Sequence, residues 1–238
     1  MIKTVGNLNQ NWLNLCFVID KSGSMYPSRE DVIGGFIKTI DEQKAKKDFK
    51  VTVSLYTFNE NVTEEYLGTD INDVKDLEYN PDGLTAMNDG IGTAIDNVGK
   101  WLYEKDVNNE EMPAKTLVVV MTDGMENASK EYTLKQVREK IKEQTEKYSW
   151  EFIYLGTDIT TTKAADELGF KFKAYGDRAT FAENYGIVNA AANTYYNCAL
   201  NNLSLEESTN AMCDVINDAS VTKTLNFEKK IGRKLSNT

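Results

Sequence analysis

The chain of 238 residues contains no histidine and only three cysteines. Without histidine the usual general base is missing, which excludes hydrolases that pair histidine with serine or cysteine. The cysteines are odd in number and irregularly spaced, at Cys16, Cys198 and Cys213, so they indicate neither a disulfide framework nor a zinc site. These absences indicate a reducing compartment and argue against ordinary nucleophilic catalysis.

Positive charge and long apolar runs are also scarce. Lysine and arginine number 27 against 37 aspartate and glutamate residues, which gives a net charge of −10. Nucleic acids and anionic membranes attract clustered positive charge, so neither is an expected partner. No segment is apolar enough to span a membrane, and residues 1–12 have no apolar signal core. We therefore expect a cytoplasmic protein, whose acidity suits a bound divalent cation or a cationic partner.

One stretch, LNLCFVIDKSGSMY at 13–26, combines an apolar run with polar residues that could bind a metal. The run is typical of a strand buried on both faces, and it ends at Asp20. Ser22 and Ser24 follow at the carboxyl end of this strand, the edge where open parallel sheets bind ligands. Gly23 permits a turn tight enough to direct both hydroxyls to one point. A carboxylate and two hydroxyls are hard oxygen donors, which suit magnesium.

Strands and helices alternate along the chain. Apolar patterns predict strands at 13–20, 51–56, 62–67, 116–121, 150–155 and 170–174, and helical spacing predicts helices at about 28–40, 87–102, 133–147, 161–168, 179–200 and 204–218. This order predicts an α/β fold with a doubly wound, mainly parallel central sheet and helices on both faces. A hairpin near 58–62 predicts one antiparallel edge strand. The strand at 51–56 alternates apolar and polar residues, so we expect one of its faces to be less buried.

Two later segments also place oxygen ligands at the ends of predicted elements. Thr85 is displayed on a tight connection that begins with Pro81 and contains Gly83. Asp123 follows the buried strand TLVVVM and precedes Gly124, which repeats the pattern of the first strand. Three separate segments therefore end in candidate ligands.

Taken together, the DxSxS pattern at 20–24, Thr85 and Asp123 resemble the metal-ion-dependent adhesion site (MIDAS) of von Willebrand factor A (VWA) domains, with every position filled. TDGMENASKEYT at 122–133 and FIYLGTD at 152–158 resemble small intracellular VWA proteins of bacteria and their phages. The resemblance runs from about residue 13 to at least residue 172 and implies a Rossmann-like fold. We expect a VWA domain at 1–203 and a C-terminal helical extension and tail at 204–238.

The resemblance also implies a role for each ligand. Ser22 and Ser24 would bind the cation directly, Thr85 directly or through water, and Asp20 and Asp123 through water and hydrogen bonds. The expected cation is Mg²⁺, with Mn²⁺ or Ca²⁺ as alternatives. Because neutral hydroxyls leave its charge poorly neutralised, it would accept an aspartate or glutamate carboxylate from a protein partner. The implied function is that of a cation-dependent binding adaptor, not an enzyme, and its partner and oligomeric state stay open.

Two other functions are consistent with the residues. A metal-dependent hydrolase or phosphotransferase could use Asp20 as its nucleophile. Hydrolases of the dehalogenase-like type have a second aspartate two positions after the nucleophile, where this chain has Ser22. The sequence also lacks a phosphate-binding Gly-Lys loop. Alternatively, the metal could only brace the loops of a structural or assembly protein.

Residues beside the ligand set are candidate partner contacts. Met25 and Tyr26 could form an apolar rim around the cation, or could begin the packing of the next helix. Glu126 and Asn127 follow the last ligand and could select the partner, or could lie in a solvated loop.

Two further aspartates lie near predicted element ends. We expect Asp89 to cap the N-terminus of its helix. We expect Asp158 to form a loop hydrogen bond. Neither is expected to bind the cation.

Overall fold

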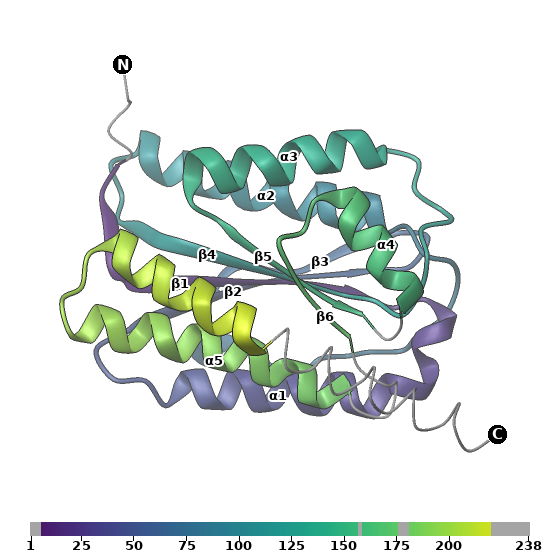
Figure 1. The fold of residues 1–238 in the computed structure, drawn as a ribbon, viewed down its shortest axis with the longest axis horizontal. Helices are drawn as coiled ribbons and strands as arrows, with labels where there is room; N and C mark the ends of the chain where they lie inside the picture. Colours follow the sequence, from purple (N-terminus) through teal and green to yellow (C-terminus); the bar gives the residue numbers. More distant parts are fainter. Residues whose placement is uncertain (1–5, 157–158, 176–180, 220–238) are drawn as a thin grey trace.

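The fold is known from a computed structural model, which describes residues 6–156, 159–175 and 181–219. Six strands form one sheet in the order β3-β2-β1-β4-β5-β6. Their bounds are β1 Leu8–Asp20, β2 Lys50–Phe58, β3 Val62–Asp70, β4 Met112–Met121, β5 Glu151–Gly156 and β6 Phe172–Tyr175. All neighbouring strands are parallel except β2 and β3, so the predicted α/β sheet with an antiparallel edge strand is confirmed (Figure 1).

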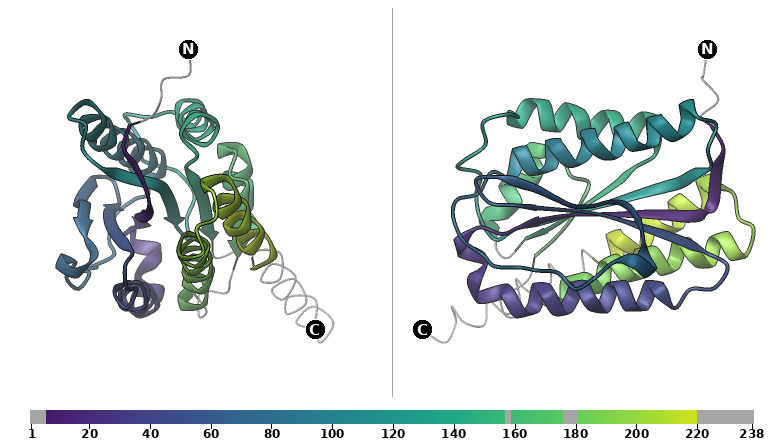
Figure 2. Two further views of the ribbon diagram at one scale, coloured as in Figure 1. Left: turned by 90° about the vertical axis from the view of Figure 1, so that its left-hand side faces the viewer. Right: turned by 180° about the vertical axis from the view of Figure 1, so that it is seen from behind.

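Helices cover both faces of the sheet, as Figures 1 and 2 show. Helices α1 and α5 and a helix at 205–219 lie on one face, and helices α2, α3 and α4 lie on the other. The helix bounds are α1 Arg29–Lys44, α2 Met87–Val107, α3 Leu134–Tyr148, α4 Ile159–Leu168 and α5 Phe181–Leu200. Two 3₁₀ turns, η1 Gly23–Ser28 and η2 Ile71–Asp73, follow β1 and β3. This is the doubly wound arrangement that the alternation of elements predicts.

Strand β1 lies at the centre of both cores. Phe17 and Ile19 pack in the core beneath α1 and α5, whereas Cys16 and Val18 pack in the core beneath α2. Because both faces of the strand are covered, its apolar run is continuous instead of alternating.

The expectation of a less buried face on β2 is wrong. Thr52 and Ser54 are both buried. Their hydroxyls donate hydrogen bonds to Asn14 Oδ1 on β1 at 3.0 and 3.4 Å. Trp12 Nε1 donates to Thr52 Oγ1 at 3.0 Å. These bonds satisfy the polar groups, so the polar residues of this strand tolerate burial.

The helix at 205–219 adds Met212 and Ile216 to the same core as α1 and α5. The predicted domain division after residue 203 stays a prediction, although the core packing does not change there. In the part of the chain that is described, no helix has the length and hydropathy of a membrane span. Asp158 lies outside the described residues.

Candidate metal centre

The carboxyl ends of β1 and β4 bring two of the predicted ligands together. These strands are parallel neighbours, with Ile19 paired to Met121. Asp20 and Asp123 therefore leave the sheet at the same edge, near the turn η1 that leads into α1 (Figure 1). Sheet register alone thus joins ligands that are far apart in the sequence.

Asp20 is fully buried, and hydrogen bonds hold each of its carboxylate oxygens. Oδ1 accepts the N–H of Ser22 at 2.7 Å, and Oδ2 accepts the hydroxyl of Thr122 at 2.5 Å. The backbone carbonyl of Asp20 accepts the hydroxyl of Tyr79. Burial raises the pKa of Asp20 to about 6, although the hydrogen bonds from Thr122 and Ser22 oppose the shift.

The orienting roles of Thr122 and Tyr79 were not predicted. Thr122 directly precedes a predicted ligand at the end of a buried strand, so its position was a usable signal. Tyr79 lies in an acidic loop without periodicity, and nothing local indicates that it reaches β1.

The two serines and Asp123 form a second part of the site. The Oγ atoms of Ser22 and Ser24 lie 3.1 Å apart, and the hydroxyl of Ser24 donates to Asp123 Oδ1 at 2.5 Å. Ser22 and Asp123 are buried, whereas Ser24 is exposed. The group is therefore open to solvent on the side of Ser24.

Backbone bonds place Thr85 beside these residues. The N–H of Gly23 donates to the carbonyl of Gly83 at 3.1 Å, which joins the η1 turn to the loop before α2. Asn127 and Thr85 exchange two bonds: the N–H of Thr85 donates to Asn127 Oδ1 at 2.9 Å, and the N–H of Asn127 donates to the carbonyl of Thr85 at 3.0 Å. Gly83 has φ +77°, a conformation that favours glycine.

Gly124 shows that the three segments converge. A methyl group built on its Cα would lie 3.3 Å from Thr85 Oγ1, 3.6 Å from Ser24 Oγ and 3.8 Å from Asp20 Oδ2. One small volume beside Gly124, on the loop after β4, is therefore lined by oxygens from two other segments, the end of β1 with η1 and the loop before α2. Hydroxyl and carboxylate oxygens are the ligands that Mg²⁺ and Mn²⁺ prefer, so the donor set fits such a cation.

The hydroxyls are essential to this interpretation. In the described part of the chain, no group of three or more histidine, cysteine, aspartate or glutamate side chains could hold a metal ion. The candidate centre has two carboxylates, Asp20 and Asp123, so its other protein ligands would be Ser22, Ser24 and Thr85.

Glu126 and Asn127 brace the loops around the centre. One carboxylate oxygen of Glu126 accepts the N–H of Asn88, in the first turn of α2, at 2.8 Å. The other accepts the N–H of Ser129 at 2.7 Å. A carboxylate at a helix N-terminus is stabilised by the helix dipole. The proposed contact of these residues with a partner stays a prediction.

Asp89 differs from the expectation of a helix cap. The N-cap of α2 is Ala86, which makes no side-chain cap. The Asp89 carboxylate instead accepts the N–H groups of Lys130, Glu131 and Tyr132 at 2.7–2.9 Å. It therefore anchors the loop that leads into α3.

Met25 does not form an apolar rim. It is 0% exposed and packs in the core beneath α1, so this candidate partner contact is wrong. Its neighbour Tyr26 is 70% exposed. The 3₁₀ turn η1 directs one of these side chains inward and the other outward.

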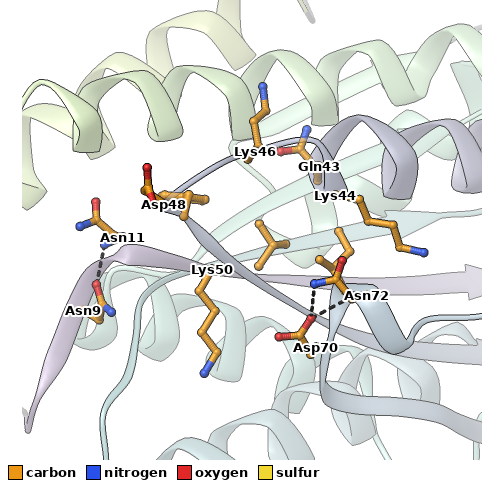
Figure 3. A pocket seen from close by; sticks show the side chains of 12 residues that line it. Asn9, Asn11, Gln43, Lys44, Lys46, Asp48, Lys50, Asp70 and Asn72 are labelled. Carbon is orange, nitrogen blue, oxygen red and sulfur yellow. Dashed lines mark hydrogen bonds between the residues drawn. The ribbon is translucent and has the colours of Figure 1, made fainter.

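A pocket of about 550 Å³ lies at the opposite edge of the sheet, between the start of β2 and the end of α1. Figure 3 shows the ammonium groups of Lys44, Lys46 and Lys50 directed away from its centre. Lys44 Nζ donates to the carbonyl of Val74, and the other two ammonium groups lie over aromatic rings. The pocket is thus remote from the candidate centre, and its lysines are engaged elsewhere.

Comparison with known families decides the identity of the fold. The family model of the von Willebrand factor type A domain matches residues 14–212. The chain belongs to the VWA family. VWA domains are in general adhesion and interaction modules that bind metal at the MIDAS. No curated protein matches the chain.

Solved VWA-like structures have the same fold at low sequence identity. The PilB minor pilin of Streptococcus sanguinis is 12% identical with a TM-score of 0.55, and the match covers 81% of this chain and 62% of that one. The domain of the pilus tip protein Mfa5 of Porphyromonas gingivalis is 10% identical with a TM-score of 0.55, covering 76% and 95%. Mussel byssus PTMP1, solved with a zinc-occupied MIDAS, is 14% identical with a TM-score of 0.52, covering 78% and 46%. The chain spans about half the length of the mussel chains, and identities this low show a shared fold only.

Proposed function

We propose that this VWA domain binds a divalent cation between its three loops and uses it to hold a carboxylate of a protein partner. The observation that supports this most is the small volume beside Gly124, which is lined by Thr85, Ser24 and Asp20. A metal-bridged contact needs ligands that leave part of the cation open. The exposure of Ser24 provides that opening.

The side chains prepare the site in different ways. Hydrogen bonds from the hydroxyl of Thr122 and the N–H of Ser22 hold the carboxylate of Asp20 in place. The carboxylate of Asp123 accepts a hydrogen bond from the hydroxyl of Ser24. When bound, the cation would supply a positive charge that neutral hydroxyls do not cancel, and thus attract an external anion. An all-oxygen donor set favours Mg²⁺ or Mn²⁺ over zinc, which prefers nitrogen and sulfur ligands.

Calorimetric titration with Mg²⁺ and Mn²⁺ tests the cation site. We expect binding by the wild type and its loss in the double variant Ser22→Ala/Ser24→Ala. Thr63→Ala is the matched control, because it removes an exposed hydroxyl from the edge strand β3, away from the centre. Unchanged binding in the double variant would contradict the proposed ligand set.

A cation-dependent protein capture tests the adaptor function. Wild-type protein in Mg²⁺ should retain a partner that chelator releases, and the double serine variant should not retain it. We place the protein in the cytoplasm of a bacterium or in a phage-encoded system. If the partner stayed bound after chelator is added, that result would contradict a metal-bridged contact. It would instead favour a metal that only braces the loops.

A hydrolase with Asp20 as nucleophile is the weaker candidate. Asp20 is 0% exposed, and both of its carboxylate oxygens accept hydrogen bonds. A nucleophile must reach its substrate, which this burial opposes. Phosphatase or nuclease turnover with Mg²⁺ that is lost in Asp20→Asn would overturn the adaptor proposal.

A further inference from the structure

Three strongly exposed apolar side chains border the candidate metal centre. Tyr26 is 70% exposed, Leu84 is 56% exposed and Met125 is 64% exposed. Tyr26 follows the ligand Ser24 by two positions, Leu84 directly precedes Thr85, and Met125 follows Asp123 by two positions. Each ligand loop therefore presents one large apolar side chain to solvent. We call these three residues the apolar rim.

Backbone hydrogen bonds keep the three loops together. The N–H of Gly23 donates to the carbonyl of Gly83 at 3.1 Å, which joins the turn of Tyr26 to the loop of Leu84. The N–H of Ala128 donates to the carbonyl of Thr85 at 3.2 Å, which joins the loop of Met125 to the same segment. The rim thus belongs to a braced set of loops around one opening.

Two large apolar side chains elsewhere in the described part of the chain are as exposed as Leu84, but they lie away from the metal centre. In the described part of the chain, the most exposed large apolar side chains besides the rim are Tyr103 at 63% and Val107 at 57%, both on the last turns of α2. These lie at the far edge of the sheet, because α2 begins beside the metal centre. Single exposed apolar residues need no explanation, but three that border one ligand opening indicate a contact surface.

Negative charge borders the same loops. Glu60 is exposed, and its Oε2 accepts the N–H of Leu84 at 3.0 Å. Asp82 is exposed on the loop before Leu84, close to Glu60 in the fold. Glu30, just after η1, is instead paired with Arg29 in a salt bridge of 2.5 Å. With a net charge of −10 on the whole chain, the carboxylates of Glu60 and Asp82 repel a partner that presents several acidic residues together.

We infer that the apolar rim selects a partner segment in which a single carboxylate is flanked by large apolar side chains. The carboxylate would face the cation, and the flanking side chains would cover Tyr26, Leu84 and Met125. The surrounding negative charge rejects acidic runs, which would otherwise also offer a carboxylate. This inference rests on the proposed function, because it assumes that the centre holds a cation.

Three short capped peptides of equal length test the inference. The first has a central aspartate flanked by leucines, the second has the same aspartate flanked by glycines, and the third contains only aspartates. Affinities are measured by calorimetry in Mg²⁺ and again in chelator. We expect the leucine-flanked peptide to bind about tenfold more tightly than the glycine-flanked one, because burial of one leucine side chain accounts for at least that ratio. We expect the all-aspartate peptide to bind no better than the glycine-flanked one.

Variants separate the rim from the cation site. Tyr26→Ser/Leu84→Ser/Met125→Ser should abolish the preference for leucine while Mg²⁺ binding is retained, since none of these residues is a proposed ligand. Tyr103→Ser/Val107→Ser/Tyr148→Ser removes a comparable apolar area elsewhere and should keep the preference.

The possible failures are distinguishable. Equal affinity for the leucine- and glycine-flanked peptides, together with intact Mg²⁺ binding, would overturn the rim and leave the proposed function standing. Preference for the all-aspartate peptide would also overturn the rim. Absence of Mg²⁺ binding by the wild type would overturn both.

Discussion

At the scale of single residues, the absence of a side chain at Gly124 keeps the candidate centre open. Oxygens of Thr85, Ser24 and Asp20 all lie within 3.8 Å of the point that a methyl group on Gly124 would occupy. Gly124 is not among the residues with positive φ. Its importance is therefore steric and not conformational.

The variant Gly124→Ala should weaken Mg²⁺ binding by about tenfold or more while the protein stays folded, because the methyl group displaces the cation or its water. Calorimetry and thermal unfolding check the two parts of this expectation. The matched control is Gly99→Ala in α2, where an added Cβ meets no atom within 4 Å. This control should leave cation binding unchanged and stabilise the helix by about 0.5–1 kcal/mol. Undiminished binding in Gly124→Ala would show that the cation, if bound, lies elsewhere.

At the scale of elements, the first turn of α2 connects the metal centre to the loop before α3. Asp89 accepts three N–H groups from residues 130–132, and Glu126 accepts the N–H of Asn88. The two acidic side chains thus link α2 and the loop after β4 in both directions. We regard both as structural braces for the loops that present the ligands.

Replacement of Asp89 by asparagine should lower the free energy of unfolding by about 1–3 kcal/mol, because a neutral amide cannot satisfy the three N–H groups equally well. Chemical denaturation measures this loss. Mg²⁺ affinity should fall less than in Ser22→Ala/Ser24→Ala, since Asp89 braces the loop and does not bind the cation. Loss of Mg²⁺ binding without loss of stability would identify Asp89 as a ligand instead.

A buried ion pair joins β4 and β5. Lys115 Nζ lies 3.1 Å from Glu151 Oε1 and also donates to the carbonyl of Ser149, the residue that ends α3. Burial lowers the pKa of Lys115, although Glu151 opposes the shift. The pair therefore specifies how the end of α3 meets the sheet, at a considerable cost in desolvation.

The single variant Lys115→Met should destabilise the protein by about 3–5 kcal/mol, because it leaves Glu151 buried without a cation. The double variant Lys115→Met/Glu151→Leu should be as stable as the wild type or more stable by about 1–4 kcal/mol. Denaturant unfolding of both variants measures these differences. A double variant that is less stable than the wild type would show that the pair itself contributes net stability.

At the scale of the whole molecule, a cation that binds only the folded chain must stabilise it. At a Mg²⁺ concentration about 100 times the dissociation constant, the gain is about 2.7 kcal/mol. For a chain of this size that corresponds to a rise in Tm of roughly 5–10 °C. Thermal scans with Mg²⁺ and with chelator check this, and Ser22→Ala/Ser24→Ala should show no rise. An equal rise in that variant would assign the effect to another site or to screening of the net charge.

The fold class follows from local patterns. Continuous apolar runs at β1 and β4 and helical spacing in α2 predict a parallel sheet between helices, which is the observed architecture. The five candidate ligands were named from three short segments, and the structure brings oxygens of these segments together. The orienting hydroxyls of Thr122 and Tyr79 were missed, because their roles depend on contacts between β1, β4 and a loop without periodicity.

Two residues show what the sequence could not decide. Met25 and Tyr26 are adjacent and both apolar, yet Met25 is buried and Tyr26 is exposed, because the 3₁₀ turn η1 rotates one toward the core. Likewise, Asp89 reaches across to residues 130–132 instead of capping its own helix. Local propensity does not specify which neighbour a side chain meets.

The sequence by itself determined the alternation of strands and helices, the family and the set of oxygen ligands, because these depend on residue type and short-range spacing. Only the tertiary structure decided where Asp20, Thr85 and Gly124 meet, which carboxylates brace loops, and which apolar side chains remain exposed. Those outcomes depend on the strand order and the register between β1 and β4, which bring segments far apart in the chain to one edge of the sheet.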